Sequence, residues 1–150
     1  MKKSKLGTEI IFDNSIKKHM WLSKNKVKAV VDVLLKKEKI QRPLTIVFTD
    51  NRTIRRLNRD YRYRDEATDV LSFEYGGKSE LLGEIIISLQ TAKRQAVKYG
   101  NSCMKETFIL LIHGFYHVLG YSHYKKAAFR KMKKKEESAL QLLLNKRMLN

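Results

Sequence analysis

The 150-residue sequence contains a single cysteine, Cys103, and a single proline, Pro43. One cysteine excludes a disulfide within the chain, and it means that a metal site would have to depend on histidine. Long hydrophobic runs are also missing, because no apolar segment approaches the roughly 20 residues that a membrane-spanning helix needs. No apolar signal-peptide core follows the lysine-rich N-terminus, so we expect a cytoplasmic protein without a membrane partner.

Acidic residues are scarce relative to basic ones. Thirty-two Lys and Arg residues oppose 15 Asp and Glu residues, which gives a formal net charge of +17. A chain with this balance attracts polyanions, and we expect nucleic acid as the partner. The charge alone would also fit binding to an anionic membrane surface, or the lysine enrichment of some thermophile proteins.

Hydrophobic periodicity predicts strands and helices in an order typical of an α+β protein. The predicted strands are residues 8–14, 43–50, 70–75 and 81–89, and the predicted helices are residues 23–40, 51–61, 89–100, 103–120 and 125–149. A short glycine-containing link joins the last two strands and predicts an antiparallel hairpin. The sequence has no internal repeat and no long linker, so we expect one domain over residues 1–150.

Histidine is rare as well, yet residues 113–123, HGFYHVLGYSH, contain three of the four in the chain. His113 and His117 are four positions apart on a predicted helix, so their imidazoles share one face and can bind one ion. Gly120 ends that helix, which allows the chain to bring His123 back to the same ion. Three histidine nitrogens leave a fourth tetrahedral position open, as in catalytic zinc sites. A lone core histidine would be ordinary, but three at this spacing favour a metal site.

The spacing equals that of the metzincin proteases, H-E-x-x-H-x-x-G-x-x-H, except at position 114. Those enzymes have a glutamate general base where this chain has Gly114, so the usual machinery of peptide hydrolysis is missing. A metalloprotease-like hydrolase therefore remains only an alternative. Glycine within a helix costs about 1 kcal/mol relative to alanine, which predicts that another part of the chain approaches the backbone at Gly114.

Three segments follow a known pattern. HGFYHVLGYSH is similar to H-G-x-L-H-L-x-G-Y-D-H, LNRDYRYRDEATDVLSFEY to L-N-x-x-Y-R-x-K-D-x-P-T-D-V-L-S-F-P-F, and LLGEIIIS to L-L-G-D-I-x-I-S. In this order, over residues 57–123, they resemble the YbeY family of bacterial metal-dependent endoribonucleases. The chain departs from the family pattern at Ser122, where the family usually has aspartate. It also has Tyr63 in place of glycine, and Ala67 and Glu74 in place of proline.

The resemblance implies an α+β fold with a mixed, mostly parallel sheet of about four strands, one of them antiparallel, packed by helices around a metzincin-like central helix. It implies one Zn²⁺ per chain, or another divalent metal such as Ni²⁺, on His113, His117 and His123. It implies that His117 and Arg62 are catalytic. It also implies cleavage of single-stranded RNA, processing of the small-subunit rRNA 3′ end, ribosome quality control, and ribosomal proteins as partners. A non-enzymatic ribosome-associated protein with a structural metal is the remaining alternative.

Arginine and tyrosine residues are interleaved in the segment before the predicted strand 70–75. Arginine binds phosphates and aromatic rings stack on unpaired bases, although solvated surface arginines would look the same in a sequence. The expected RNA-binding residues are Arg55, Arg56, Arg59, Arg62, Tyr63 and Arg64. Asp65 and Asp69 are candidate general bases, but Asp69 fits a turn or cap better. The residues do not decide whether water or the RNA 2′-hydroxyl attacks.

Overall fold

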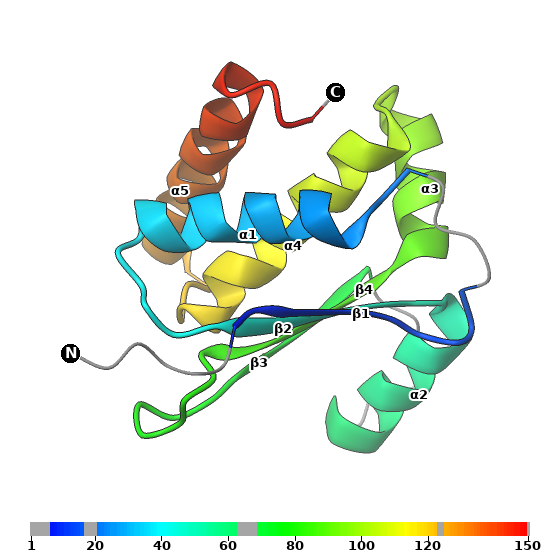
Figure 1. The fold of residues 1–150 in the computed structure, drawn as a ribbon, viewed down its shortest axis with the longest axis horizontal. Coiled ribbons are helices and arrows are strands. Elements are labelled where there is room, and N and C mark those ends of the chain that lie inside the picture. Colours follow the sequence, from blue (N-terminus) through cyan, green and yellow to red (C-terminus); the bar gives the residue numbers. More distant parts are fainter. Residues whose placement is uncertain (1–6, 17–20, 63–68, 123–124, 150) are drawn as a thin grey trace.

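The computed structural model describes residues 7–16, 21–62, 69–122 and 125–149. Four strands and five helices lie in these ranges (Figure 1). In chain order they are β1 Glu9–Phe12, α1 Lys24–Lys37, β2 Leu44–Thr49, α2 Asn51–Arg62, β3 Val70–Glu74, β4 Gly83–Ser88, α3 Leu89–Tyr99, α4 Cys103–Val118 and α5 Lys126–Asn145. Each predicted element is present with the predicted type, and the differences lie at the element ends.

The strands form one mixed sheet in the order β1-β2-β4-β3. The central strand β2 pairs in parallel with β1 and with β4, and Ile46 lies opposite Ile10 on one side and Ile85 on the other. The edge strand β3 is antiparallel to β4, with Leu71 opposite Ile86. The predicted hairpin and the mostly parallel sheet with one antiparallel strand are therefore confirmed, and with them the α+β fold class.

Alternating side chains divide between the two faces of the sheet. On one face, Ile46, Phe48 and Ile85 belong to the main core, which α1 and α4 cover. On the other face, Leu71 and Ile86 pack in a smaller cluster with Ile54 of α2. Figure 1 shows α1 and α4 on one side of the sheet and α2 on the other.

Helix α4 is the central buried helix that its apolar composition predicts. It begins after Ser102, whose side-chain oxygen accepts a hydrogen bond from the Lys105 backbone N–H at 3.0 Å. Phe108, Leu111 and Phe115 are fully buried along its length. The helix ends at Val118, and Gly120 then adopts a φ of +94°, a value that favours glycine. The turn expected after the histidine-bearing helix is thus present.

The helices can also be compared with the dimensions of a lipid bilayer. In the part of the chain that the structure describes, every helix is too short or too polar to cross a membrane.

Candidate metal site and cationic surface

His113 and His117 lie one turn apart near the end of α4, and their rings meet edge to face. The two Nε2 atoms are 3.1 Å apart, and the ring planes make an angle of 82°. Both side chains are partly exposed, so the pair is accessible from solvent, whereas most residues of the helix are buried. The predicted convergence of these two imidazoles is therefore present in the structure.

The distance between the two nitrogens fits a shared metal ion. Two ligands that each lie about 2.0–2.1 Å from a tetrahedral Zn²⁺ are roughly 3.3 Å apart, close to the separation found here. Within residues 7–16, 21–62, 69–122 and 125–149, no group of three or more His, Cys, Asp and Glu side chains could hold a metal. The predicted third ligand, His123, lies outside the described residues. The described part of the site therefore supplies two of the three expected nitrogens.

Glu136 of α5 contacts the far side of the His113 ring. Its Oε1 atom is 3.3 Å from Nδ1 of His113, and both side chains are about a quarter exposed, at 24% and 26%. Glu136 is not among the site residues predicted from the sequence. The sequence did contain a signal, because the apolar residues Met132, Ala139 and Leu143 recur at helical spacing and Glu136 falls in the same stripe. An acidic residue in an apolar stripe indicates a specific partner.

Helix α5 is fixed against α1 and α4 by a largely buried carboxylate. Glu38, which follows α1, accepts hydrogen bonds from Tyr116 Oη and Lys135 Nζ, each at 3.0 Å. Burial acts to raise the pKa of Glu38, but hydrogen bonds from Lys135, Lys37 and Tyr116 outweigh it and hold the pKa below its ordinary value. Burial, together with this nearby carboxylate, raises the pKa of Tyr116, so its hydroxyl remains a donor. The hydrogen bond between Lys135 and Glu38 fixes this turn of α5, and it thereby helps to place the neighbouring Glu136 next to His113.

Gly114 allows α4 to pack directly on the sheet. A Cβ atom at this position would lie 2.7 Å from Ile85 Cγ2 and 3.1 Å from Ser72 Oγ. The Ser72 hydroxyl also donates a hydrogen bond of 3.1 Å to the Gly114 carbonyl. The predicted close approach is confirmed. A side chain at position 114 would point into the sheet, so the general base of a metzincin protease has no room here.

We expect Gly114→Ala to lower the free energy of unfolding by up to about 2 kcal/mol, because an extra methyl group in a packed core usually costs about 1–3 kcal/mol. The better helix propensity of alanine recovers only about 1 kcal/mol of this. Denaturant unfolding measures the difference. Gly77→Ala is the matched control, because a Cβ there would meet no atom within 4 Å. A Gly114→Ala protein that is more stable than wild type would contradict the close packing.

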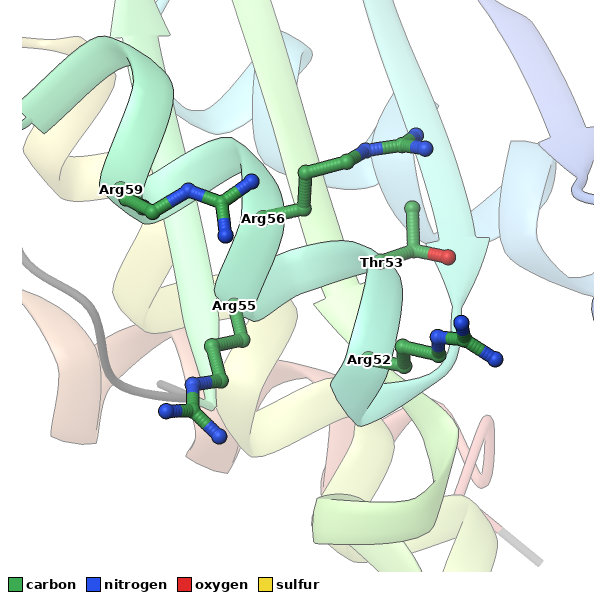
Figure 2. A pocket seen from close by; sticks show the side chains of 5 residues that line it. All are labelled: Arg52, Thr53, Arg55, Arg56 and Arg59. Atoms are coloured by element: carbon green, nitrogen blue, oxygen red, sulfur yellow. The ribbon is translucent and has the colours of Figure 1, made fainter.

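Helix α2 carries a dense group of arginines on the other side of the sheet. Its start is capped by Asp50, whose Oδ1 accepts a hydrogen bond from the Thr53 backbone N–H at 2.8 Å. Figure 2 shows the arginine side chains projecting from successive turns of the helix. They line a cavity of about 480 Å³. The residues that line it are Arg52, Thr53, Arg55, Arg56 and Arg59. The cavity has the size and charge to bind a phosphate group.

The structure groups three of the predicted RNA-binding residues, Arg55, Arg56 and Arg59, at this cavity. The other predicted contacts, Tyr63, Arg64 and the side chain of Arg62, lie outside the described residues, as does Asp65. Asp69 has the local role expected of it, because its Oδ1 accepts a hydrogen bond from the Val70 backbone N–H at 2.8 Å at the start of β3.

An exposed aromatic residue lies near the arginines. Tyr61 is 67% exposed, and its ring meets Phe73 of β3 edge-on with the ring centroids 6.2 Å apart. With Arg56, these two rings line a second hollow of about 560 Å³ against the sheet. Because two thirds of Tyr61 is exposed, much of its surface is available for stacking.

An α+β fold that carries an arginine-lined helix and a converging histidine pair is typical of the class of proteins that bind polyanions. Comparison with known proteins narrows this class to one family. The family model for endoribonuclease YbeY matches residues 11–144. The endoribonuclease YbeY of Carboxydothermus hydrogenoformans is 40% identical over 121 residues, which cover 79% of this chain and 85% of that protein. That of Geobacillus thermodenitrificans is 45% identical over 109 residues, which cover 65% and 70%.

Structural comparison supports the same fold. The solution structure of TM1509 from Thermotoga maritima has a TM-score of 0.61 with this chain at 25% sequence identity, over 95% of both chains. Taken with the family model and the curated relatives, these matches place the chain in a family. It belongs to the YbeY family of endoribonucleases.

Proposed function

We propose that this endoribonuclease cleaves single-stranded RNA with a divalent metal ion bound by His113, His117 and His123. Its proposed substrate is ribosomal RNA in the cytoplasm, at the 3′ end of the small-subunit RNA, with ribosomal proteins as partners. The proposed role is rRNA maturation and ribosome quality control. The observation that carries the proposal is the 3.1 Å separation of the His113 and His117 Nε2 atoms in a chain of this family.

The donor set favours zinc, with Ni²⁺ as a second candidate, because imidazole nitrogen suits both metals. One ion per chain, when bound, would neutralise phosphate charge and lower the pKa of a bound water to about 7. The chain itself contributes the two converging imidazoles and the carboxylate of Glu136 behind one of them. The third nitrogen is assigned to His123 from the sequence pattern alone.

Phosphate binding is assigned to the arginines of α2. Their guanidinium groups carry fixed positive charge and can donate two parallel hydrogen bonds to a phosphate. Arg62 ends α2, and from the family resemblance we assign it to the scissile phosphate, where a guanidinium would stabilise the developing charge. Tyr61 provides a ring on which an unpaired base could stack.

Cleavage is expected only when the metal ion is present. Protein stripped with a chelator should leave an end-labelled single-stranded RNA with the small-subunit 3′ sequence intact, and Zn²⁺ or Ni²⁺ should restore cleavage. The same RNA annealed to its complement should not be cleaved. The measurement is product formation on a gel, with metal content determined in parallel by elemental analysis.

Three results would count against the proposal. Equal cleavage by metal-free protein would show that cleavage does not require a metal ion. Hydrolysis of casein without RNA cleavage would favour a protease in spite of Gly114. Tight RNA binding with no cleavage under any metal would favour a non-enzymatic role.

A further inference from the structure

The two ring nitrogens of His113 face different partners. Nε2 faces the Nε2 atom of His117 at 3.1 Å, and Nδ1 faces Oε1 of Glu136 at 3.3 Å. The first partner comes from the same helix, one turn away. The second, Glu136, comes from α5 and is 23 positions further along the chain. Helix α5 therefore contributes a carboxylate at the side of the ring that is turned away from the candidate metal position.

This arrangement selects one tautomer of His113. A neutral imidazole carries a single N–H, and an ionised carboxylate can only accept a hydrogen bond. Contact with Glu136 therefore favours the proton on Nδ1, which leaves the lone pair of Nε2 directed at the space beside His117. A metal ligand needs that lone pair, and an unrestrained imidazole would be free to carry its proton on either nitrogen.

The position of Glu136 is not that of an ordinary surface acid. Its side chain is 24% exposed, and it shares a stripe of α5 with buried Met132 and Ala139. The adjacent Lys135 is held by Glu38 at 3.0 Å, which limits how far this turn of α5 can move. Glu137, the next acidic residue on the same helix, is exposed and lies outside this stripe.

We propose that Glu136 is a positioning residue that holds His113 in the Nδ1–H tautomer and thereby raises the affinity of the histidine site for a divalent metal. The metal part of this inference rests on the proposed function, whereas the tautomer part concerns the metal-free protein. Carboxylates that orient a metal-binding histidine typically change metal affinity by about 10–100-fold.

Metal affinity and the tautomer of His113 test the inference separately. In Glu136→Ala, the dissociation constant for Zn²⁺ or Co²⁺, measured by competition with a chromophoric chelator, should rise about 10–100-fold. Glu136→Gln should lose less metal affinity, because its amide oxygen can still accept the hydrogen bond from Nδ1 of His113. In metal-free wild type at about pH 8, above the ordinary histidine pKa of about 6.5, ¹⁵N NMR should find the His113 proton on Nδ1. It should move toward Nε2 in Glu136→Ala.

Glu137→Ala is the matched control, since it removes the same charge from the same helix. Thermal unfolding of each metal-free variant reports whether the fold is retained, and Glu136→Gln preserves the side-chain shape if the alanine variant does not fold. Equal metal affinity in wild type and Glu136→Ala, or equal losses of affinity in Glu136→Ala and Glu137→Ala, would overturn the inference. So would a wild-type His113 protonated on Nε2. A wild type that binds no metal would instead overturn the proposed function.

Discussion

Replacement of His117 by alanine is expected to reduce RNA cleavage by roughly 10³-fold, which corresponds to about 4 kcal/mol of transition-state stabilisation. The reason is that His117 provides one of the two nitrogens that converge at 3.1 Å, and a single imidazole from α4 would not hold a metal ion in a fixed place. A bound divalent ion contributes several kcal/mol by charge stabilisation alone, so its loss accounts for an effect of this size. Single-turnover cleavage of a labelled RNA gives the rate, and elemental analysis gives the metal content.

The control for this experiment is His19→Ala, the same substitution at the histidine that lies outside the motif. Cleavage and metal content should be unchanged in that variant. The fold of His117→Ala should persist, because the ring is partly exposed and the core of α4 is made by residues such as Phe108 and Leu111. Loss of cleavage with full metal content would mean that His117 acts in another way than as a metal ligand. Retention of both cleavage and metal content would contradict the proposed metal site.

The sequence predicted which elements form, because their hydrophobic periods are clear, but it did not predict where two of the helices end. Helix α1 was expected to continue to residue 40, yet it ends at Lys37. Lys39 adopts a φ of +57°, and the Ile40 N–H donates to the Leu35 carbonyl at 2.9 Å. Helix α5 ends in the same way before Arg147, whose φ is also +57°. Glycine normally marks such ends, and without it the sequence carries no visible signal.

The site was predictable where its geometry is local. His113 and His117 are four positions apart on one helix, so helical geometry alone brings their rings together. Glu136 could not be found in this way, because its contact with His113 depends on how α5 crosses α4. The orientation of position 114 was also invisible in the sequence. A missing glutamate argued against proteolysis, but only the structure shows that a side chain there would meet Ile85 and Ser72.

Substitution of the α2 arginines should have the second large effect, a loss of RNA affinity, because α2 concentrates positive charge on one exposed surface. Arg52, Arg56 and Arg59 follow helical spacing and line one cavity (Figure 2). The ion pair between Arg59 and Asp60, at 3.2 Å, is exposed and contributes little to stability. These three arginines can therefore be changed to glutamine, which retains good helix propensity, with little expected effect on folding.

The Arg52→Gln, Arg56→Gln, Arg59→Gln triple variant is expected to bind single-stranded RNA about 100-fold more weakly near 100 mM salt. Each lost phosphate contact costs on the order of 1 kcal/mol, and about 1.4 kcal/mol corresponds to tenfold in affinity. The dependence of log affinity on log salt should also become shallower by about 2, because each contact to a single strand contributes about 0.7. Fluorescence anisotropy with a labelled RNA over about 50–200 mM salt measures both quantities.

The matched control lies across the sheet, on α1. Lys24, Lys28 and Lys36 are exposed there, and their triple replacement by glutamine lowers the net charge by the same amount. If general attraction between a +17 chain and RNA dominates, the two triple variants should lose affinity equally. If RNA contacts the α2 surface directly, only the arginine variant should show the 100-fold loss and the shallower salt dependence. Since α1 and α2 cover opposite faces of the sheet, equal losses would remove α2 from the RNA-binding surface, while the histidine site would be unaffected by that result.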